Sequence, residues 1–125
     1  MQTFSKSERL SGKVLIDKLI ESGASFNISP FRGTWRIVDV SESNVQVLIS
    51  VPKRIYKRAV DRNLLKRRIR ESYRKNKTEL CSSMENKNMH FMLIYTSKSM
   101  LEYKELEEKT KEVLIRLVKE VKSKN

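Results

Sequence analysis

Residues 53–77 concentrate positive charge in a way that suits binding to a polyanion. The segment holds twelve Lys or Arg residues and two acids, Asp61 and Glu71, so it carries +10 of the chain's formal net charge of +12. On a helix, basic residues four positions apart are neighbours, and each like-charge pair costs roughly 0.2–0.5 kcal/mol. The basic residues at 58, 62, 66, 70 and 74 form such pairs in succession. A phosphate backbone would supply the missing negative charge.

Residues suited to catalysis are few and scattered. His90 is the only histidine and lies in an apolar stretch, so a packed or edge-exposed side chain without a catalytic role is expected there. Cys81 has no histidine near it in sequence, and a single cysteine excludes an internal disulfide. The aspartates lack metal-site spacing, and the three glycines form no phosphate-binding loop. The sequence therefore predicts no catalytic residue, no metal site and no cofactor on the protein.

Two aromatic residues on a predicted strand could serve either the core or a binding surface. Phe31 and Trp35 share one parity of a predicted strand at 31–40, and Arg32 and Arg36 share the other. The rings either belong to the core or form a platform for unpaired bases, each stacked base contributing roughly 1–3 kcal/mol. Both readings remain open from the sequence.

The basic segment must be positioned by elements on both sides of it. Residues 13–22 favour a short helix that ends at Gly23. Strands are predicted at 31–40 and 45–51, where apolar and polar residues alternate, and the pair is expected to form a hairpin with a turn at 41–44.

The central helix is expected to begin near Asp61, which would act as its N-cap. Val60 and Leu65 are placed to form a hydrophobic staple across that cap. Leu65, Ile69 and Tyr73 form a narrow apolar stripe, which predicts that one side of this helix packs and the rest is basic.

The C-terminal half contains a buried strand and an amphipathic helix. A polar loop is predicted at 81–88, and residues 89–95 are apolar almost throughout, as in a central strand covered on both faces. Residues 101–122 carry apolar side chains in a 3.6-residue period, which predicts a helix. The strand–helix–strand step implies at least one crossover in a mixed sheet.

Composition indicates a charged globular domain. The chain has 125 residues, enough for one domain with a modest core, and its pI of about 10.0 meets the usual criterion for a nucleic-acid-binding domain. No apolar run reaches the roughly 20 residues of a membrane span, and the N-terminus lacks the pattern of a secretory signal. A cytoplasmic protein without membrane contact is expected, and charge alone does not distinguish DNA from RNA.

The arrangement SVPKRIYKRAVDRNLLKRRIRESYR at 50–74 resembles the signature of the bacterial ribonuclease P protein subunit. Its matching residues are Ser50, Lys53, Arg54, Ala59, Arg62, Asn63, Lys66, Arg67, Arg70, Glu71, Tyr73 and Arg74. Phe4, Arg9 and Leu10 are similar to the family's N-terminal opening. Leu64 departs from the pattern, which usually has arginine there, and Pro52 replaces a more usual small residue.

The resemblance implies a single α+β domain over residues 1–125, with the order α-β-β-β-α-β-α. Its mixed sheet would contain a left-handed βαβ crossover, against the general rule. A similar domain occurs in a small-subunit ribosomal protein and in the translocation elongation factor. The resemblance also implies binding to the catalytic RNA of ribonuclease P, which with magnesium removes the 5′ leader from precursor tRNA. No obligate protein partner is evident.

The resemblance also implies two groups of site residues. A basic face would contact the RNA subunit, and a cleft between the first helix and the sheet would hold the single-stranded leader. The expected RNA-binding residues are Lys53, Arg54, Lys57, Arg58, Arg62, Asn63, Lys66, Arg67, Arg70 and Arg74. The expected cleft residues are Phe31, Trp35, Ser50 and Lys53.

Two other classes of nucleic-acid-binding protein share the charge. A basic structural RNA-binding protein, such as a ribosomal component, is the alternative, and it would need no leader cleft. A DNA-binding regulator is less favoured, because the sequence shows no second short helix at helix-turn-helix spacing.

Overall fold

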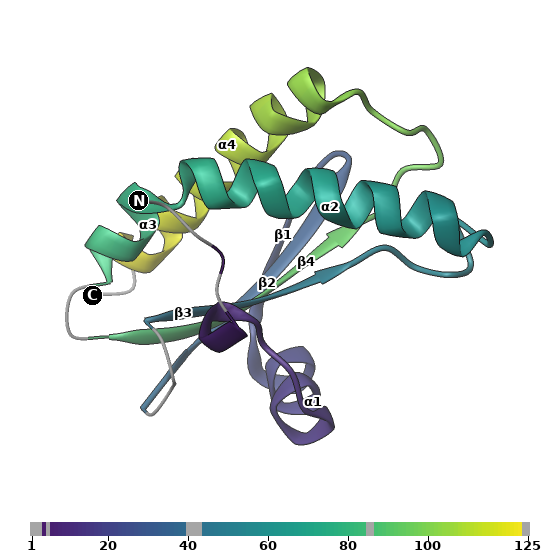
Figure 1. The fold of residues 1–125 in the computed structure, drawn as a ribbon. Coiled ribbons are helices and arrows are strands. Elements are labelled where there is room, and N and C mark those ends of the chain that lie inside the picture. The colour runs from purple at the N-terminus through teal and green to yellow at the C-terminus, as the bar shows by residue number, and fades with distance from the viewer. Residues whose placement is uncertain (1–3, 5, 40–43, 85–86, 124–125) are drawn as a thin grey trace.

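The computed structural model describes residues 4, 6–39, 44–84 and 87–123. Helices α2, α3 and α4 lie on one side of a sheet and α1 lies on the other (Figure 1). In chain order the elements are η1 (Lys6–Glu8), α1 (Lys13–Ser22), β1 (Ala24–Ile28), β2 (Phe31–Val38), β3 (Val45–Ser50), α2 (Ala59–Asn76), α3 (Thr78–Ser83), β4 (Asn88–Tyr95) and α4 (Tyr103–Ser123). This order confirms the predicted α+β domain, to which η1 and α3 add two short helices.

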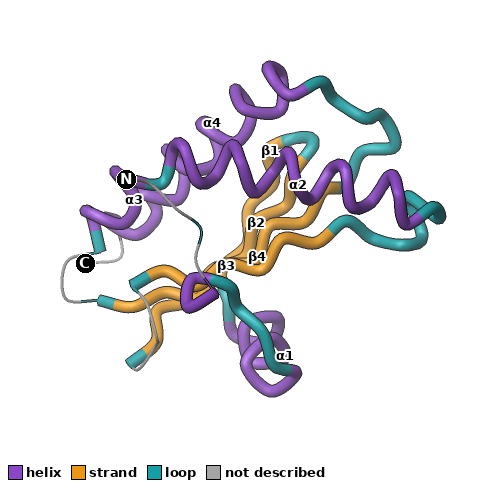
Figure 2. Tube along the Cα trace, in the orientation of Figure 1, coloured by secondary structure: helices purple, strands orange, loops and turns teal. Residues whose placement is uncertain are grey.

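The four strands form one mixed sheet in the order β1-β2-β4-β3 (Figure 2). β4 pairs antiparallel with β2 and parallel with β3, so that Phe91 lies opposite both Trp35 and Val47. The apolar sequence of β4 follows from this central position, since helices cover one face and α1 covers part of the other. The crossover from β3 through α2 and α3 to its parallel neighbour β4 confirms the predicted mixed sheet.

The predicted hairpin between 31–40 and 45–51 is wrong. β2 instead pairs with β1, with Ala24 opposite Trp35, and β4 separates β2 from β3. The insertion has a physical reason: β4 is the most continuously apolar strand, and the centre of the sheet gives it a neighbour on each edge. Residues 41–43 of the predicted turn lie outside the described residues.

The apolar stripe of α2 packs as predicted. Leu65, Ile69 and Tyr73 have no exposed surface, which fixes this side of the helix against the sheet and α4. Where α2 crosses α4, the hydroxyl oxygens of Ser72 and Thr110 lie 2.9 Å apart, so the polar atoms at this buried crossing satisfy each other. The opposite side of α2 is left for its basic residues.

The start of α2 differs from the prediction. The helix begins at Ala59, and its N-cap residue Arg58 makes no side-chain capping hydrogen bond. Asp61 lies inside the first turn, where its carboxylate interacts favourably with the positive end of the helix dipole. Val60 is 65% exposed, so the predicted staple between Val60 and Leu65 does not form.

The end of α1 agrees with the prediction, whereas α3 replaces part of a predicted loop. Gly23 ends α1 as predicted, and its N–H donates to Leu19 O at 2.8 Å. A Cβ at Gly23 would lie 2.5 Å from that same oxygen, so only glycine fits there. The predicted loop at 81–88 is shorter than expected because α3 continues to Ser83, and residues 85–86 lie outside the described residues.

Candidate nucleic-acid interface

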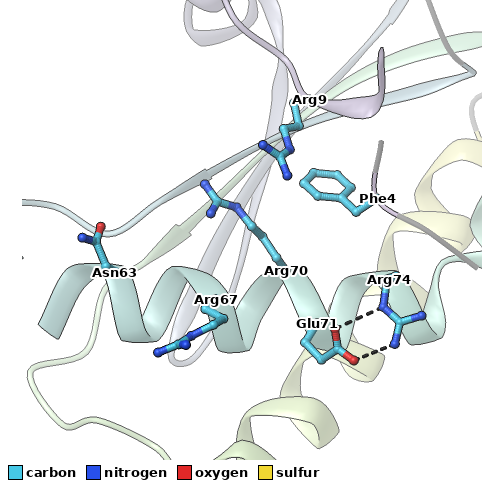
Figure 3. A pocket seen from close by; sticks show the side chains of 7 residues that line it. All are labelled: Phe4, Arg9, Asn63, Arg67, Arg70, Glu71 and Arg74. Atoms are coloured by element: carbon cyan, nitrogen blue, oxygen red, sulfur yellow. Dashed lines mark hydrogen bonds and ion pairs between the residues drawn. The ribbon is translucent and has the colours of Figure 1, made fainter. Parts of the chain in front are cut away.

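A groove of about 450 Å³ runs along the outer side of α2. Asn63, Arg67, Arg70 and Arg74 follow one another at intervals of three or four residues, so they share one face of the helix. Figure 3 shows this face with two side chains of the N-terminal segment beside it. The lining residues are Phe4, Arg9, Asn63, Arg67, Arg70, Glu71 and Arg74.

Among the described residues of the groove lining, the one acid is already engaged. Glu71 accepts hydrogen bonds from Arg74 Nη2 at 2.6 Å and from Arg74 Nε at 3.1 Å. The hydrogen bond from Arg74 lowers the pKa of Glu71, and the same bond raises the pKa of Arg74. Both groups stay charged at neutral pH, and Glu71 leaves the charges of Arg67 and Arg70 uncompensated within this lining.

The structure brings four of the ten predicted RNA-binding residues into the groove: Asn63, Arg67, Arg70 and Arg74. The loop before α2 holds four others, all exposed: Lys53, Arg54, Lys57 and Arg58. Lys66 is half-buried on α2 outside the groove lining. The predicted RNA-binding residues are therefore divided between the groove on α2 and the exposed loop that leads into this helix.

Arg62 has a structural task within this basic segment. Its Nη1 donates to Tyr56 O at 2.9 Å and to Lys57 O at 2.8 Å. Arg62 precedes Leu65 by three residues, so it lies toward the buried side of α2. Its guanidinium fastens the incoming loop to the helix, and loss of Arg62 would disturb the start of α2 as well as remove a charge.

A second hollow of about 390 Å³ lies between α1 and the sheet. It is on the face opposite α2 and α4, and its strand residues belong to one parity of β1, β2 and β4. Arg54 reaches it from the loop before α2. The lining residues are Ile20, Ser25, Asn27, Arg32, Thr34, Arg54, Met92, Ile94 and Thr96. This hollow, here called the α1–sheet cleft, has the position predicted for the leader cleft.

The prediction that Phe31 and Trp35 line this cleft as a base-stacking platform is wrong. Both rings are in the core, 1% and 3% exposed, on the face covered by α2 and α4. Trp35 Nε1 donates to Glu120 Oε1 at 2.8 Å, and the Phe31 ring meets Tyr95 edge-on with centroids 5.7 Å apart. Successive residues of a strand point to opposite faces of the sheet. The other set of alternating residues on β2, which includes Arg32 and Thr34, therefore faces the cleft.

The other two predicted cleft residues lie near the hollow without lining it. Ser50 is aligned with Ile94, which is aligned with Arg32, so Ser50 shares the cleft face and is half-buried. Lys53 is exposed in the turn after β3. None of the residues that line the α1–sheet cleft was among the four predicted cleft residues, and Arg54 was predicted only as an RNA-binding residue. The basic parity of β2, which includes Arg32, was a usable signal for this face.

Burial shifts the pKa of both residues that could take part in acid–base or nucleophilic chemistry, His90 and Cys81. Burial, followed by the charge of Arg36, lowers the pKa of His90, whose ring is 2% exposed. Burial raises the pKa of the Cys81 thiol, which disfavours the nucleophilic thiolate. In the described ranges, no three His, Cys, Asp or Glu side chains gather as a potential metal site. None of the helices described is long and apolar enough to cross a membrane.

A basic groove on α2 and an open cleft on the opposite face of the sheet are features of a small, basic α+β protein whose charge suits a polyanion. A family model described as Ribonuclease P matches residues 4–118. The chain belongs to this family of ribonuclease P protein components, and membership makes it a component of an endoribonuclease complex for tRNA processing. The resemblance seen in residues 50–74 is confirmed.

Relatives and solved structures agree with this membership. The chain is 32% identical over 124 residues to the ribonuclease P protein component of Porphyromonas gingivalis strain W83, across 95% of this chain and 89% of that protein. Its fold is similar to the RNase P protein of Staphylococcus aureus, with a TM-score of 0.71, 20% identity, and coverage of 91% and 97% of the two chains. The RNase P protein of Thermotoga maritima has a TM-score of 0.67 and 24% identity, with coverage of 87% and 96%.

Proposed function

We propose that this chain is the protein subunit of a ribonuclease P in which the RNA subunit performs the cleavage. The α2 groove binds the RNA subunit, and the α1–sheet cleft holds the 5′ leader of precursor tRNA. The observation that carries this proposal is the arginine groove on α2, whose one acid is paired with Arg74, in a chain of this family. The deciding experiment is leader cleavage by the reconstituted complex.

The α2 groove has the chemistry for a phosphate backbone. Each guanidinium presents several N–H donors in a planar fork that matches two phosphate oxygens. Arg67 and Arg70, three residues apart on one helix face, also place uncompensated positive charge at the roughly 5–6 Å spacing of helix neighbours. Such contacts release counterions from the RNA, so affinity falls as salt rises.

The α1–sheet cleft suits an unpaired strand. Arg32 and Arg54 supply charge for its phosphates, and Ile20, Met92 and Ile94 supply apolar surface for its bases. None of the described residues that line it is aromatic. Leader bases would therefore bind through aliphatic contact, and the phosphates would contribute the charge-dependent part of the affinity.

The chemical step belongs to the RNA subunit and its magnesium ions in this proposal. The protein reduces phosphate repulsion between the RNA subunit and the precursor, which magnesium also does, and it positions the leader at the cleavage site. We infer that the complex acts in the cytoplasm.

Replacement of Arg67 by Ala should weaken RNA-subunit binding and make it less dependent on salt. Loss of one phosphate contact is expected to reduce the slope of log affinity against log salt by about 0.9. Filter binding at several salt concentrations measures the slope. Lys119→Ala, which removes an exposed charge from α4, is the matched control. An Arg67→Ala slope equal to that of the control would remove Arg67 from the interface.

Replacement of Arg32 by Ala should weaken binding of leader-bearing precursor more than binding of mature tRNA. A hydrogen bond to a charged group contributes about 1.5–3 kcal/mol, so a roughly tenfold loss of the precursor preference is expected. Affinities of the holoenzyme for both RNAs give this preference. Arg36→Ala is the control, because Arg36 has the same parity on β2 but does not line the cleft. Equal effects of the two variants would contradict leader binding in this cleft.

A further inference from the structure

The N-terminal segment is held against the sheet and α2 by several contacts. Leu10 N donates to Val47 O at 2.9 Å, and Gln46 Nε2 donates to Ser7 O at 3.0 Å. Glu8 forms an ion pair with Lys77 at the C-terminal end of α2, and both side chains are largely buried. Arg9 lies between these attachment points, so its backbone has a defined place beside the groove.

The side chain of Arg9 is oriented by an aromatic stack. Its guanidinium carbon lies 5.3 Å from the centre of the Phe4 ring, within cation–π range. Phe4 in turn meets the buried ring of Tyr73 edge-on, with centroids 5.6 Å apart. Two anchored aromatic rings thus support Arg9 from the side of the core, and its charged end is exposed toward the groove.

Arg70 extends from α2 toward Arg9, and the two guanidinium groups approach each other across the groove (Figure 3). Partial burial, followed by the charge of Arg9, lowers the pKa of Arg70. The two acids nearest in sequence are already paired, Glu8 with Lys77 and Glu71 with Arg74. Within the described part of the chain, no carboxylate is paired with Arg9 or Arg70. Two like charges held together in this way favour an anion between them.

We propose that Arg9 and Arg70 form a clamp for a single phosphodiester group of the RNA subunit, which joins the N-terminal segment to α2. The proposal rests on the proposed function for the source of the phosphate. It adds a contact from the N-terminal segment, which lies outside the basic signature at residues 50–74. The ion pair between Glu8 and Lys77 and the ring of Phe4 hold one half of the clamp in place.

Binding of a bacterial ribonuclease P RNA across a salt series tests the clamp. Arg9→Ala should weaken binding by about tenfold and lower the salt slope by about 0.9. Arg9→Lys should keep the slope, because the charge remains, but should bind roughly threefold more weakly, because lysine lacks the two-pronged fork. Lys119→Ala removes the same charge from α4 and should change affinity less than about twofold.

A second measurement uses the protein alone with inorganic phosphate. Phosphate should shift the NMR signals of the Arg9 and Arg70 side chains with a common midpoint, and Arg9→Ala should abolish the response of Arg70. Circular dichroism confirms that each variant is folded. The clamp is overturned if Arg9→Ala behaves as Lys119→Ala in RNA binding, or if Arg70 responds to phosphate unchanged without Arg9.

These two measurements separate the clamp from the proposed function. If the unmodified chain does not bind the RNA, the proposed function fails, and the phosphate titration still decides whether Arg9 and Arg70 bind an anion together. If the chain binds the RNA but Arg9→Ala binds equally well, the function stands and the clamp fails.

Discussion

Leader cleavage by a bacterial ribonuclease P RNA at low magnesium should increase by about two orders of magnitude when this chain is added. A factor of 100 corresponds to about 2.7 kcal/mol of transition-state stabilisation. Charge neutralisation by the α2 groove and positioning of the leader in the α1–sheet cleft are together expected to supply this free energy. Single-turnover cleavage of a precursor tRNA with and without the protein measures it.

The stimulation should shrink as magnesium rises, because magnesium performs the same neutralisation of phosphate repulsion. The double variant Arg67→Ala/Arg70→Ala should lose most of the effect at low magnesium and remain folded, since neither side chain is in the core. Arg62→Ala is a poorer probe, because its guanidinium also fastens residues 56 and 57 to α2. Cleavage by nuclease-treated protein without any RNA subunit would assign the chemistry to the protein and contradict the proposal.

Trp35→Ala should lower the free energy of unfolding by about 3–5 kcal/mol, as expected for deletion of a buried aromatic side chain. Trp35 is 3% exposed within the main core, and its indole N–H donates to Glu120. Trp35→Phe should cost less, about 1–2 kcal/mol, because it keeps most of the apolar contact and loses the hydrogen bond. Urea unfolding of the three proteins gives the difference.

The same variants distinguish a core residue from a leader-binding residue. In conditions where Trp35→Phe is folded, its preference for precursor over mature tRNA should equal that of the unmodified chain. A lost preference in a folded, stable Trp35→Phe protein would return Trp35 to the leader site and contradict the burial of its ring.

The sequence by itself determined the features that depend on neighbours along the chain. The basic helix with its stripe of Leu65, Ile69 and Tyr73, and the amphipathic C-terminal helix, follow from the 3.6-residue period. Gly23 was also recognisable as a helix end, because glycine directly follows the apolar residues of the predicted helix and is a common C-terminal cap. The signature at 50–74 also indicated the family, because its residue types are spaced along a single segment.

Only the tertiary structure decided which strands pair and which strand faces are covered. Alternation places Phe31 and Trp35 together but does not say whether their face meets α2 and α4 or the α1–sheet cleft, because both faces of this sheet pack against helices. The position of β4 between β2 and β3 depends on contacts about fifty residues apart in sequence. The approach of Arg9 to Arg70 likewise depends on the tertiary structure. The two residues are far apart in sequence, and the local residue pattern around each does not predict that both line one groove.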